Sequence, residues 1–217
     1  MNKAIRSVLG RFSQGLARQR QTIGLYDYIP VIDGSAYVSP NAVLVGEVKV
    51  SSDSCVLSGS VIRGDVNAVT IENHVQIGEN CSVSVVPSIY KSGELAECTI
   101  GENCVIGANS SLVSCTLERT VFVGPGSVVC EGAVIEKEVV VGPNSVVPPS
   151  RILPARTLWA GNPVRFVKNL TKEEISMLNR LKIDHENNMR TLASHEIELS
   201  SNYIWEEEEM KKILNNN

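Results

Sequence analysis

The chain has 217 residues, of which 43% are hydrophobic, 5% aromatic and 20% charged, and its formal net charge is −4 at pH 7. An acidic chain lacks the basic surface that nucleic acid requires, so nucleic acid is not expected as a partner. No hydrophobic run approaches the roughly 20 residues that a membrane-spanning helix needs. The composition fits one compact domain with appendages, and the low aromatic content fits a narrow interior filled by aliphatic side chains.

Residues 1–26 form a distinct basic arm. Five basic residues precede the first acidic one, Asp27: Lys3, Arg6, Arg11, Arg18 and Arg20. Hydrophobic residues at helical spacing predict a basic amphipathic helix: Ile5, Val8, Leu9, Phe12 and Leu16. Such a segment is typical of a mitochondrial transit peptide. The alternative, which we favour, is a retained arm that docks on a partner or a membrane surface and carries targeting information within it.

Residues 27–153 are predicted to form the main domain, where from Ile32 onward an aliphatic residue recurs at every sixth position in long runs. The clearest runs are Ile32, Val38, Leu44, Val50, Val56 and Ile62, and later Leu117, Val123, Val129, Ile135, Val141 and Val147. The fourth residue after each is usually small, as at Ala42, Ser54, Ser60, Ser127 and Ala133. A period of six belongs neither to a helix nor to a simple strand, and an antiparallel protein of period two would not keep this phase. The pattern predicts a left-handed parallel β-helix with three six-residue faces per coil.

Glycine follows the aliphatic residue in several hexads, for example in Ile77-Gly78 and Ile106-Gly107. Glycine suits a tight corner, so we expect positive φ angles at these positions.

The repeat is interrupted three times. The step from Ile62 to Ile71 is nine positions instead of six, which indicates three inserted residues near Asp65-Val66-Asn67. Residues 86–94 contain Pro, Gly and charged residues, and they predict a loop that leaves one corner. A step of five from Leu112 to Leu117 then removes one residue. At about 18 residues per coil the region predicts six to seven coils, whose two ends need caps.

The six cysteines lack the CxxC spacing of a metal site. They are residues 55, 81, 98, 104, 115 and 130. Cys81 and Cys104 occupy the small inward position, which favours a place in the core over zinc ligation. Free thiols of this kind favour a reducing compartment.

Residues 154–200 are predicted to form a connector and a C-terminal helix. Thr171-Lys172-Glu173-Glu174 is a capping box, which predicts a helix from about 172 to about 199. Its apolar stripe would lie against the flank of the solenoid or against a neighbouring subunit: Ile175, Leu178, Leu181, Met189 and Leu192. Residues 201–217 form an acidic and polar tail.

Three stretches carry a family resemblance: Arg63-Gly64-Asp65-Val66-Asn67, Ile77-Gly78-Glu79-Asn80 and Trp159-Ala160-Gly161-Asn162-Pro163-Val164-Arg165. Over residues 26–180 they resemble the γ-class carbonic anhydrases, and among these the γ-carbonic-anhydrase-like subunits of mitochondrial respiratory complex I. Active members of this family are trimers that hold zinc at subunit interfaces through three histidines. The resemblance places the first ligand at Ser84 and the other two, from an IGH-x4-H stretch, at Ala108 and Val113.

None of these three residues can replace a histidine. Alanine and valine offer no lone pair, and serine is a poor zinc ligand. The glutamine that orients the zinc-bound water in the family corresponds to Gly78. Without the metal no hydroxide forms near neutral pH. The three histidines, His74, His185 and His195, are too scattered to rebuild the site. We therefore predict no metal, no cofactor, no catalytic residue and no carbonic anhydrase activity.

Arg63 and Glu79 correspond to a charge pair that links neighbouring subunits in the family, with Asp65 expected to hold Arg63 at the bulged corner. A local surface pair is the alternative. The resemblance implies a silent structural subunit of a heterotrimer with related subunits. That heterotrimer would be attached to the membrane arm of complex I on the matrix side of the inner membrane, with lipid contact through the basic arm.

Two other functions stay open. One is a hexapeptide acyltransferase that uses His74 as a general base. The other is a soluble homotrimeric binding protein unrelated to respiration.

Overall fold

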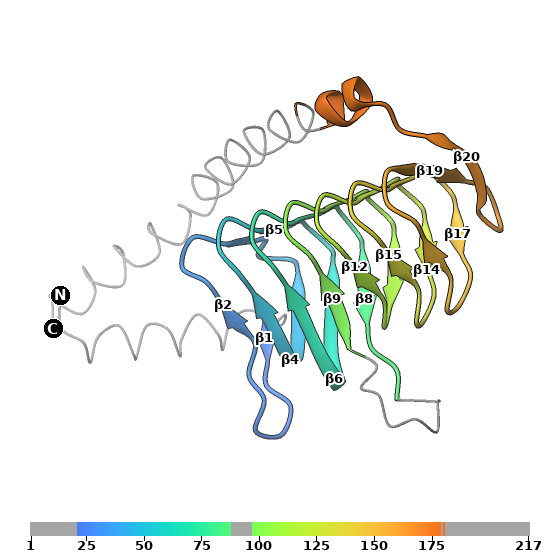
Figure 1. Cartoon of the computed structure of the whole chain (residues 1–217). Helices are drawn as coiled ribbons and strands as arrows, with labels where there is room; N and C mark the ends of the chain where they lie inside the picture. Colours follow the sequence, from blue (N-terminus) through green and yellow to red (C-terminus); the bar gives the residue numbers. More distant parts are fainter. Residues whose placement is uncertain (1–20, 88–96, 179, 181–217) are drawn as a thin grey trace, which may run out of the picture. The chain divides into compact units, whose positions relative to one another are not determined.

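The computed structural model describes residues 21–87, 97–178 and 180. Within them the chain winds through twenty short strands into a parallel β-solenoid (Figure 1). The chain divides into two compact units, Met1–Ile175 and Ser176–Asn217, and the solenoid belongs to the first. Four predicted features lie wholly or mostly outside the described residues: the basic arm, the 86–94 loop, the helix beyond residue 180 and the acidic tail.

The solenoid has three faces. The first face contains β1 (Thr22–Ile23), the first half of β4 (Val43–Val50), the first half of β6 (Val61–Ile71), β8 (Ser82–Ser84), β11 (Ser111–Val113), β14 (Val128–Val129) and β17 (Val146–Val147). The second face contains β3 (Tyr37–Val38), β5 (Cys55–Val56), β7 (Gln76–Ile77), β10 (Val105–Ile106), β13 (Phe122–Val123), β16 (Val140–Val141), β19 (Thr157–Ala160) and β20 (Arg165–Asn169). The third face contains β2 (Val31–Ile32), the second halves of β4 and β6, β9 (Cys98–Ile100), β12 (Thr116–Leu117), β15 (Val134–Ile135) and β18 (Ile152–Leu153).

The strand pairing confirms the predicted parallel β-helix. Between the strands of the described residues every pairing is parallel except that of β19 with β20. Seven parallel strands lie on the second face, one for each coil, in agreement with the expected six to seven. The pairing also includes β1, β19 and β20, which lie outside the predicted solenoid range of 27–153.

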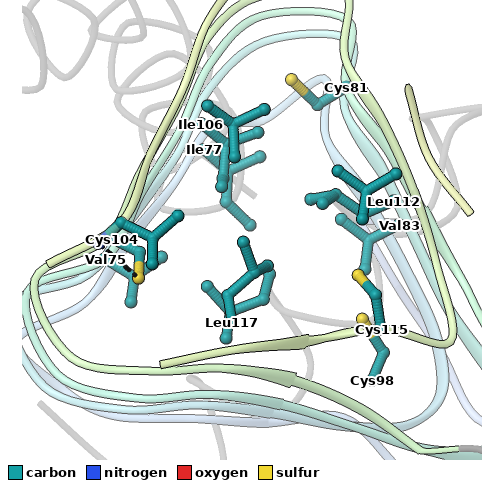
Figure 2. Close-up of a cluster of buried hydrophobic side chains, with 14 of the residues drawn as sticks. Val75, Ile77, Cys81, Val83, Cys98, Cys104, Ile106, Leu112, Cys115 and Leu117 are labelled. Carbon is teal, nitrogen blue, oxygen red and sulfur yellow. Dashed lines mark hydrogen bonds between the residues drawn. The ribbon is translucent and has the colours of Figure 1, made fainter. Parts of the chain in front are cut away.

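The hexad positions fill the core. Successive coils stack like on like, so that Ile77 lies on Ile106 and Val83 on Leu112 (Figure 2). The largest fully buried side chains are all hexad residues or their counterparts: Leu44, Val50, Val56, Ile62, Ile71, Ile77, Ile100, Ile106, Leu112, Leu117, Ile135 and Leu153. Burial of one such side chain contributes about 1.5–3 kcal/mol, which makes these columns the main source of stability.

The small inward residues have a second role beyond filling narrow corners. The hydroxyl of Ser60 donates to the carbonyl of Gly78 (2.7 Å) and accepts from the amide of Cys81 (3.1 Å), both in the next coil. Ser127 repeats this arrangement with Gly142 (2.9 Å) and Ser145 (3.3 Å). These buried serines satisfy backbone groups at corners where the strand ladder stops.

Two of the three predicted interruptions of the repeat lie within the described residues, and both are where the sequence places them. Gly46 of β4 pairs with Gly64 of β6, and Val48 pairs with Val69, so two steps along β4 match five along β6. Three extra residues therefore bulge from β6, as predicted. Leu117 pairs with Ile100 at a spacing of one residue less than a regular coil.

The corner glycines do not have the expected positive φ. At Gly78 a Cβ atom would lie 2.6 Å from the amide nitrogen of Ala108 in the next coil, so glycine is required by close approach between coils. Positive φ angles occur two residues later, at Asn80 (53°), Asn109 (59°) and Asn144 (51°), because asparagine tolerates the left-handed region. The prediction for Gly78 was wrong because steric contact, not backbone handedness, selects the residue.

Both ends of the solenoid are capped within the described residues. At the first coil the side-chain amide of Gln21 donates to the carbonyls of Val38 (2.7 Å) and Ser39 (3.2 Å). At the last coil Trp159 is 7% exposed, with the Arg151 guanidinium 5.3 Å from its ring centroid and the Phe166 ring edge-on at 5.8 Å. The Trp159-to-Arg165 motif is thus a cap of the core.

The predicted capping box is present at residues 171–174. The amide of Glu174 donates to the Thr171 hydroxyl (3.3 Å), and the Thr171 amide donates to the Glu174 carboxylate (3.0 Å). Helical residues follow from 172 to 178. The contact with Lys168 and the amide of Thr171 lower the pKa of Glu174. No helix of the described part has the length and apolar character needed to cross a bilayer.

Candidate functional site on the first face

Three residues form a column along the outside of the first face. Arg63 pairs in register with Ser84, and Ser84 with Val113, on three successive coils. Their preceding residues, Ile62, Val83 and Leu112, are fully buried. Because neighbouring residues of a strand point to opposite sides, Arg63, Ser84 and Val113 point outward. We call these three residues the outer column.

Ala108 lies at the opposite edge of the same face. It follows β10 of the second face and precedes β11 of the first, so it occupies the corner between them. Its carbonyl accepts from the amide of Gly126 (2.9 Å), and the carbonyl of Glu79 accepts from the neighbouring Asn109 (2.8 Å). The structure therefore brings Ser84 and Val113 together and places Ala108 with Glu79 at another corner.

The side chains at these positions do not fit a zinc ion. Ser84 offers one hydroxyl, Val113 and Ala108 offer only methyl groups, and zinc requires imidazole, thiolate or carboxylate. Within residues 21–87, 97–178 and 180 no group of three or more His, Cys, Asp or Glu residues could hold a metal ion. At Gly78, where the resemblance places the water-orienting glutamine, the backbone of Ala108 leaves no room for a side chain.

Cysteine does not supply a substitute ligand on the outer column. Cys81 and Cys104 are buried, as predicted, and their thiols donate to carbonyls inside the wall, of Gly107 (3.2 Å) and Glu118 (2.9 Å) respectively. Burial raises the pKa of Cys81, which disfavours the thiolate that zinc would bind.

Arg63 belongs to an ion pair at the bulge of β6. Its guanidinium lies 2.5 Å from the Asp65 carboxylate, and the two side chains are 55% and 22% exposed. The coils touch at this bulge, because a Cβ atom on Gly64 would lie 2.2 Å from the carbonyl oxygen of Glu47. Asn67 ties the bulge to the carbonyl of Val86 (3.1 Å). The expected Arg63–Asp65 pair is therefore present within the chain.

Glu79 does not join this pair, because it is exposed at the corner of Ala108. Arg63 and Glu79 thus lie at opposite edges of the first face. This is the arrangement that a contact between neighbouring subunits would need, and their role at an interface stays a prediction.

His74 lies at a different corner, between the third and second faces. It is half-buried with a φ of 56°, and its amide donates to the carbonyl of Ser52 (3.1 Å). A groove of about 460 Å³ opens nearby, lined by carboxylates of Glu72, Glu102 and Glu118 among others, and His74 is not part of its lining. The structure therefore separates His74 from the outer column.

Comparison with known proteins agrees with this architecture. Residues 114–149 match the family model described as bacterial transferase hexapeptide (six repeats). A hexapeptide transferase family protein from Anaplasma phagocytophilum has a similar structure, with a TM-score of 0.72 and 28% sequence identity over 80% of this chain and 99% of that one.

Curated relatives decide the family. The chain is 37% identical to Gamma carbonic anhydrase-like 2, mitochondrial, of Arabidopsis thaliana, over 90% of this chain and 76% of the relative. It is 34% identical to Gamma carbonic anhydrase 1, mitochondrial, of the same plant, over 81% of this chain, and it spans 64% of that protein's length. The chain belongs to the γ-carbonic anhydrase family. These relatives include both carbonic anhydrases and carbonic-anhydrase-like proteins. Their names therefore do not tell whether this chain is an enzyme, and the question depends on the metal-binding atoms of the first face.

Proposed function

We propose that this chain is a catalytically silent, structural member of the γ-carbonic anhydrase family. The proposal rests on the outer column, where Ser84 and Val113 lie side by side. Together these two side chains offer a single hydroxyl oxygen as a metal ligand. Ala108, at the other edge of the face, supplies no donor atom either. Without zinc the chain has no means of lowering the pKa of water toward neutrality.

The two edges of the first face would contribute to two different seams of a trimer. In the family one subunit gives two ligands to one seam and one ligand to the next. A chain with Ser84 and Val113 at one edge and Ala108 at the other would disable both seams that it touches. In a heterotrimer with related subunits, only the seam between its two companions could then retain zinc. The chain would have a structural role in such an assembly and no catalytic one.

The proposed location is the matrix side of the mitochondrial inner membrane, on the membrane arm of complex I. The mitochondrial names of the relatives and the five basic residues before Asp27 support a mitochondrial location. The attachment to complex I rests on the family resemblance. Mass spectrometry of gently solubilised inner membrane should find the chain together with complex I subunits, and a free homotrimer alone would refute the attachment.

Restoring the ligands tests the vacated site. The triple variant Ser84→His, Ala108→His and Val113→His should gain zinc, up to one ion per seam where the chain self-associates, while the unmodified chain binds none. A control with the same number of histidines places them on three different faces, with Ser82→His, Thr116→His and Arg165→His, and should gain none. Zinc is counted by elemental analysis after dialysis against a weak chelator. A folded, trimeric triple variant without zinc would show that these positions were assigned wrongly.

The acyltransferase alternative has one observation in its favour, the transferase name of the matched repeat model. Hydrolysis or transfer of acyl-coenzyme A by the purified chain, abolished by His74→Ala, would replace the structural proposal with this one.

A further inference from the structure

Two cysteines stack on one another inside the solenoid. Cys98 and Cys115 occupy the same inward position of consecutive coils, because Thr99 pairs with Thr116 and the Thr99 amide donates to the carbonyl of Cys115 (3.0 Å). Their exposed fractions are 0% and 1%. Figure 2 shows both side chains along one wall, apart from Cys81 and Cys104 at the two other corners.

The thiols of Cys81 and Cys104 have other partners. Cys81 and Cys104 each donate to a backbone carbonyl of the next coil. The thiol of Cys115 instead donates to the sulfur of Cys98, which lowers the pKa of Cys98 and raises that of Cys115. Among the six free cysteines, Cys98 and Cys115 thus form a pair that interacts across two consecutive coils.

The backbone spacing suits a covalent bond. Adjacent parallel strands lie about 4.8 Å apart, which falls within the Cα separation of roughly 4.4–6.8 Å that a disulfide spans. The neighbours in the same column are aliphatic, with Val69 before Cys98 and Ala133 after Cys115.

We propose that Cys98 and Cys115 form an intrachain disulfide that links two coils when the folded chain meets a small-molecule disulfide such as oxidised glutathione. The Cys98 thiolate attacks one sulfur of glutathione disulfide, which forms a mixed disulfide and releases one glutathione thiolate. The Cys115 thiolate then attacks the Cys98 sulfur and releases the second glutathione. The two cysteines lose two electrons and two protons, and one glutathione disulfide becomes two glutathione thiols.

The bond would close one coil, from Cys98 through β10 and β11 to Cys115. Because both sulfurs are buried, the exchange requires a local opening of this coil, so it proceeds slowly and reverses slowly. The resulting disulfide would resist separation of β9 from β12.

The test equilibrates the folded chain in glutathione buffers from fully reduced to fully oxidised, followed by acid quench, alkylation and peptide mass spectrometry. The expected result is a Cys98–Cys115 linked peptide, with Cys81 and Cys104 alkylated, and a melting temperature that rises on oxidation and returns with reductant. Cys98→Ala should abolish both changes, and alanine already occupies this column at Ala133. The matched control Cys104→Ser should retain them.

Three outcomes would overturn the proposal. The first is a folded chain in which Cys98 and Cys115 are still free thiols, and so become fully alkylated, after incubation in oxidised glutathione for longer than the unfolding time. The second is linked peptides that involve all cysteines equally, since that indicates oxidation of the unfolded chain. The third is an oxidation-dependent rise in melting temperature that persists in Cys98→Ala. The measurement on the unmodified chain decides even where a variant fails to fold.

Discussion

The inner and outer residues of β8 and β11 differ although they are neighbours along the chain. Val83 and Leu112 point inward and are fully buried in register with each other. Ser84 and Val113 follow them directly, point outward and are half-buried. The inward pair is the aliphatic column that every hexapeptide coil needs, whereas the outward pair lacks the donors that zinc needs.

This difference shows that the inward and outward residues of one strand meet separate structural requirements. Alternate residues of a strand belong to different environments, so an outward substitution leaves the packing of the inward column untouched. Substitutions at Ser84 or Val113 should therefore leave the buried column of Val83 and Leu112 intact. The following experiments test this separation.

The largest effect on stability is expected for a substitution in the buried core. Leu112→Ala should lower the free energy of unfolding by about 2–5 kcal/mol, because it leaves a cavity between Val83 and Val129. Val113→Ala, one residue away, should cost less than about 1 kcal/mol because its side chain is half-buried on the outer surface. Urea unfolding followed by circular dichroism measures both. Equal losses would contradict the separation of inner and outer roles.

The second largest loss of stability is expected for a substitution at the bulge of β6, where two coils touch. Gly64→Ala would place a Cβ atom 2.2 Å from the carbonyl oxygen of Glu47, and backbone would have to move. We expect a loss of about 1–3 kcal/mol, as for other overpacked sites. Gly34→Ala is the control, since no heavy atom lies within 4 Å of the point that its new Cβ atom would occupy. A tolerated Gly64→Ala would mean that the coils are less tightly joined here than described.

The third largest effect on stability is expected at the buried serines that bond the next coil. Ser127→Ala removes the donor to Gly142 and the acceptor of the Ser145 amide, which leaves buried backbone groups unpaired. The expected cost is about 1–2 kcal/mol. The exposed Ser82→Ala should be neutral, and a neutral Ser127→Ala would show that smallness alone explains the serines.

The smallest effect on folding is expected at Arg63. Its pair with Asp65 is largely solvent-exposed, so Arg63→Ala should change the stability of the single chain by less than about 1 kcal/mol. If Arg63 also lies at a subunit seam, native mass spectrometry should show a shift toward monomers, which Arg63→Lys would reproduce in part because lysine lacks the bidentate fork. An unchanged assembly would refute the interface role.

The sequence predicted the interior in detail because the hexad repeat leaves little choice. Once Ile62, Val83 and Leu112 are placed inward, Arg63, Ser84 and Val113 must align outside, so the outer column could be counted from the printed chain. The three-residue bulge followed from the same count. The positions of Cys81 and Cys104 were also correct for this reason.

Other features depend on contacts that the repeat does not encode. Cys98 and Cys115 each stand two residues before a hexad residue, Ile100 and Leu117, so the repeat puts both inward. Their interaction across two coils was nevertheless not predicted, because it depends on the pairing of β9 with β12. The requirement for glycine at Gly78 arises from the approach of Ala108 in the next coil, which no local turn rule describes. Thr22 precedes the first hexad, yet β1 pairs with β4 at the open edge of the first coil. Each of these features arises from packing between coils.

The metal content of the assembled, unmodified chain tests the silent site most directly. Native mass spectrometry of the protein, purified without chelators and combined with elemental analysis for zinc, measures it in one experiment. We predict that the mass of the assembly equals that of its polypeptides and that zinc is not stoichiometric at any seam formed by this chain. One zinc ion per seam, bound through Ser84, Ala108 or Val113 or their neighbours, would contradict the structural role proposed for this chain.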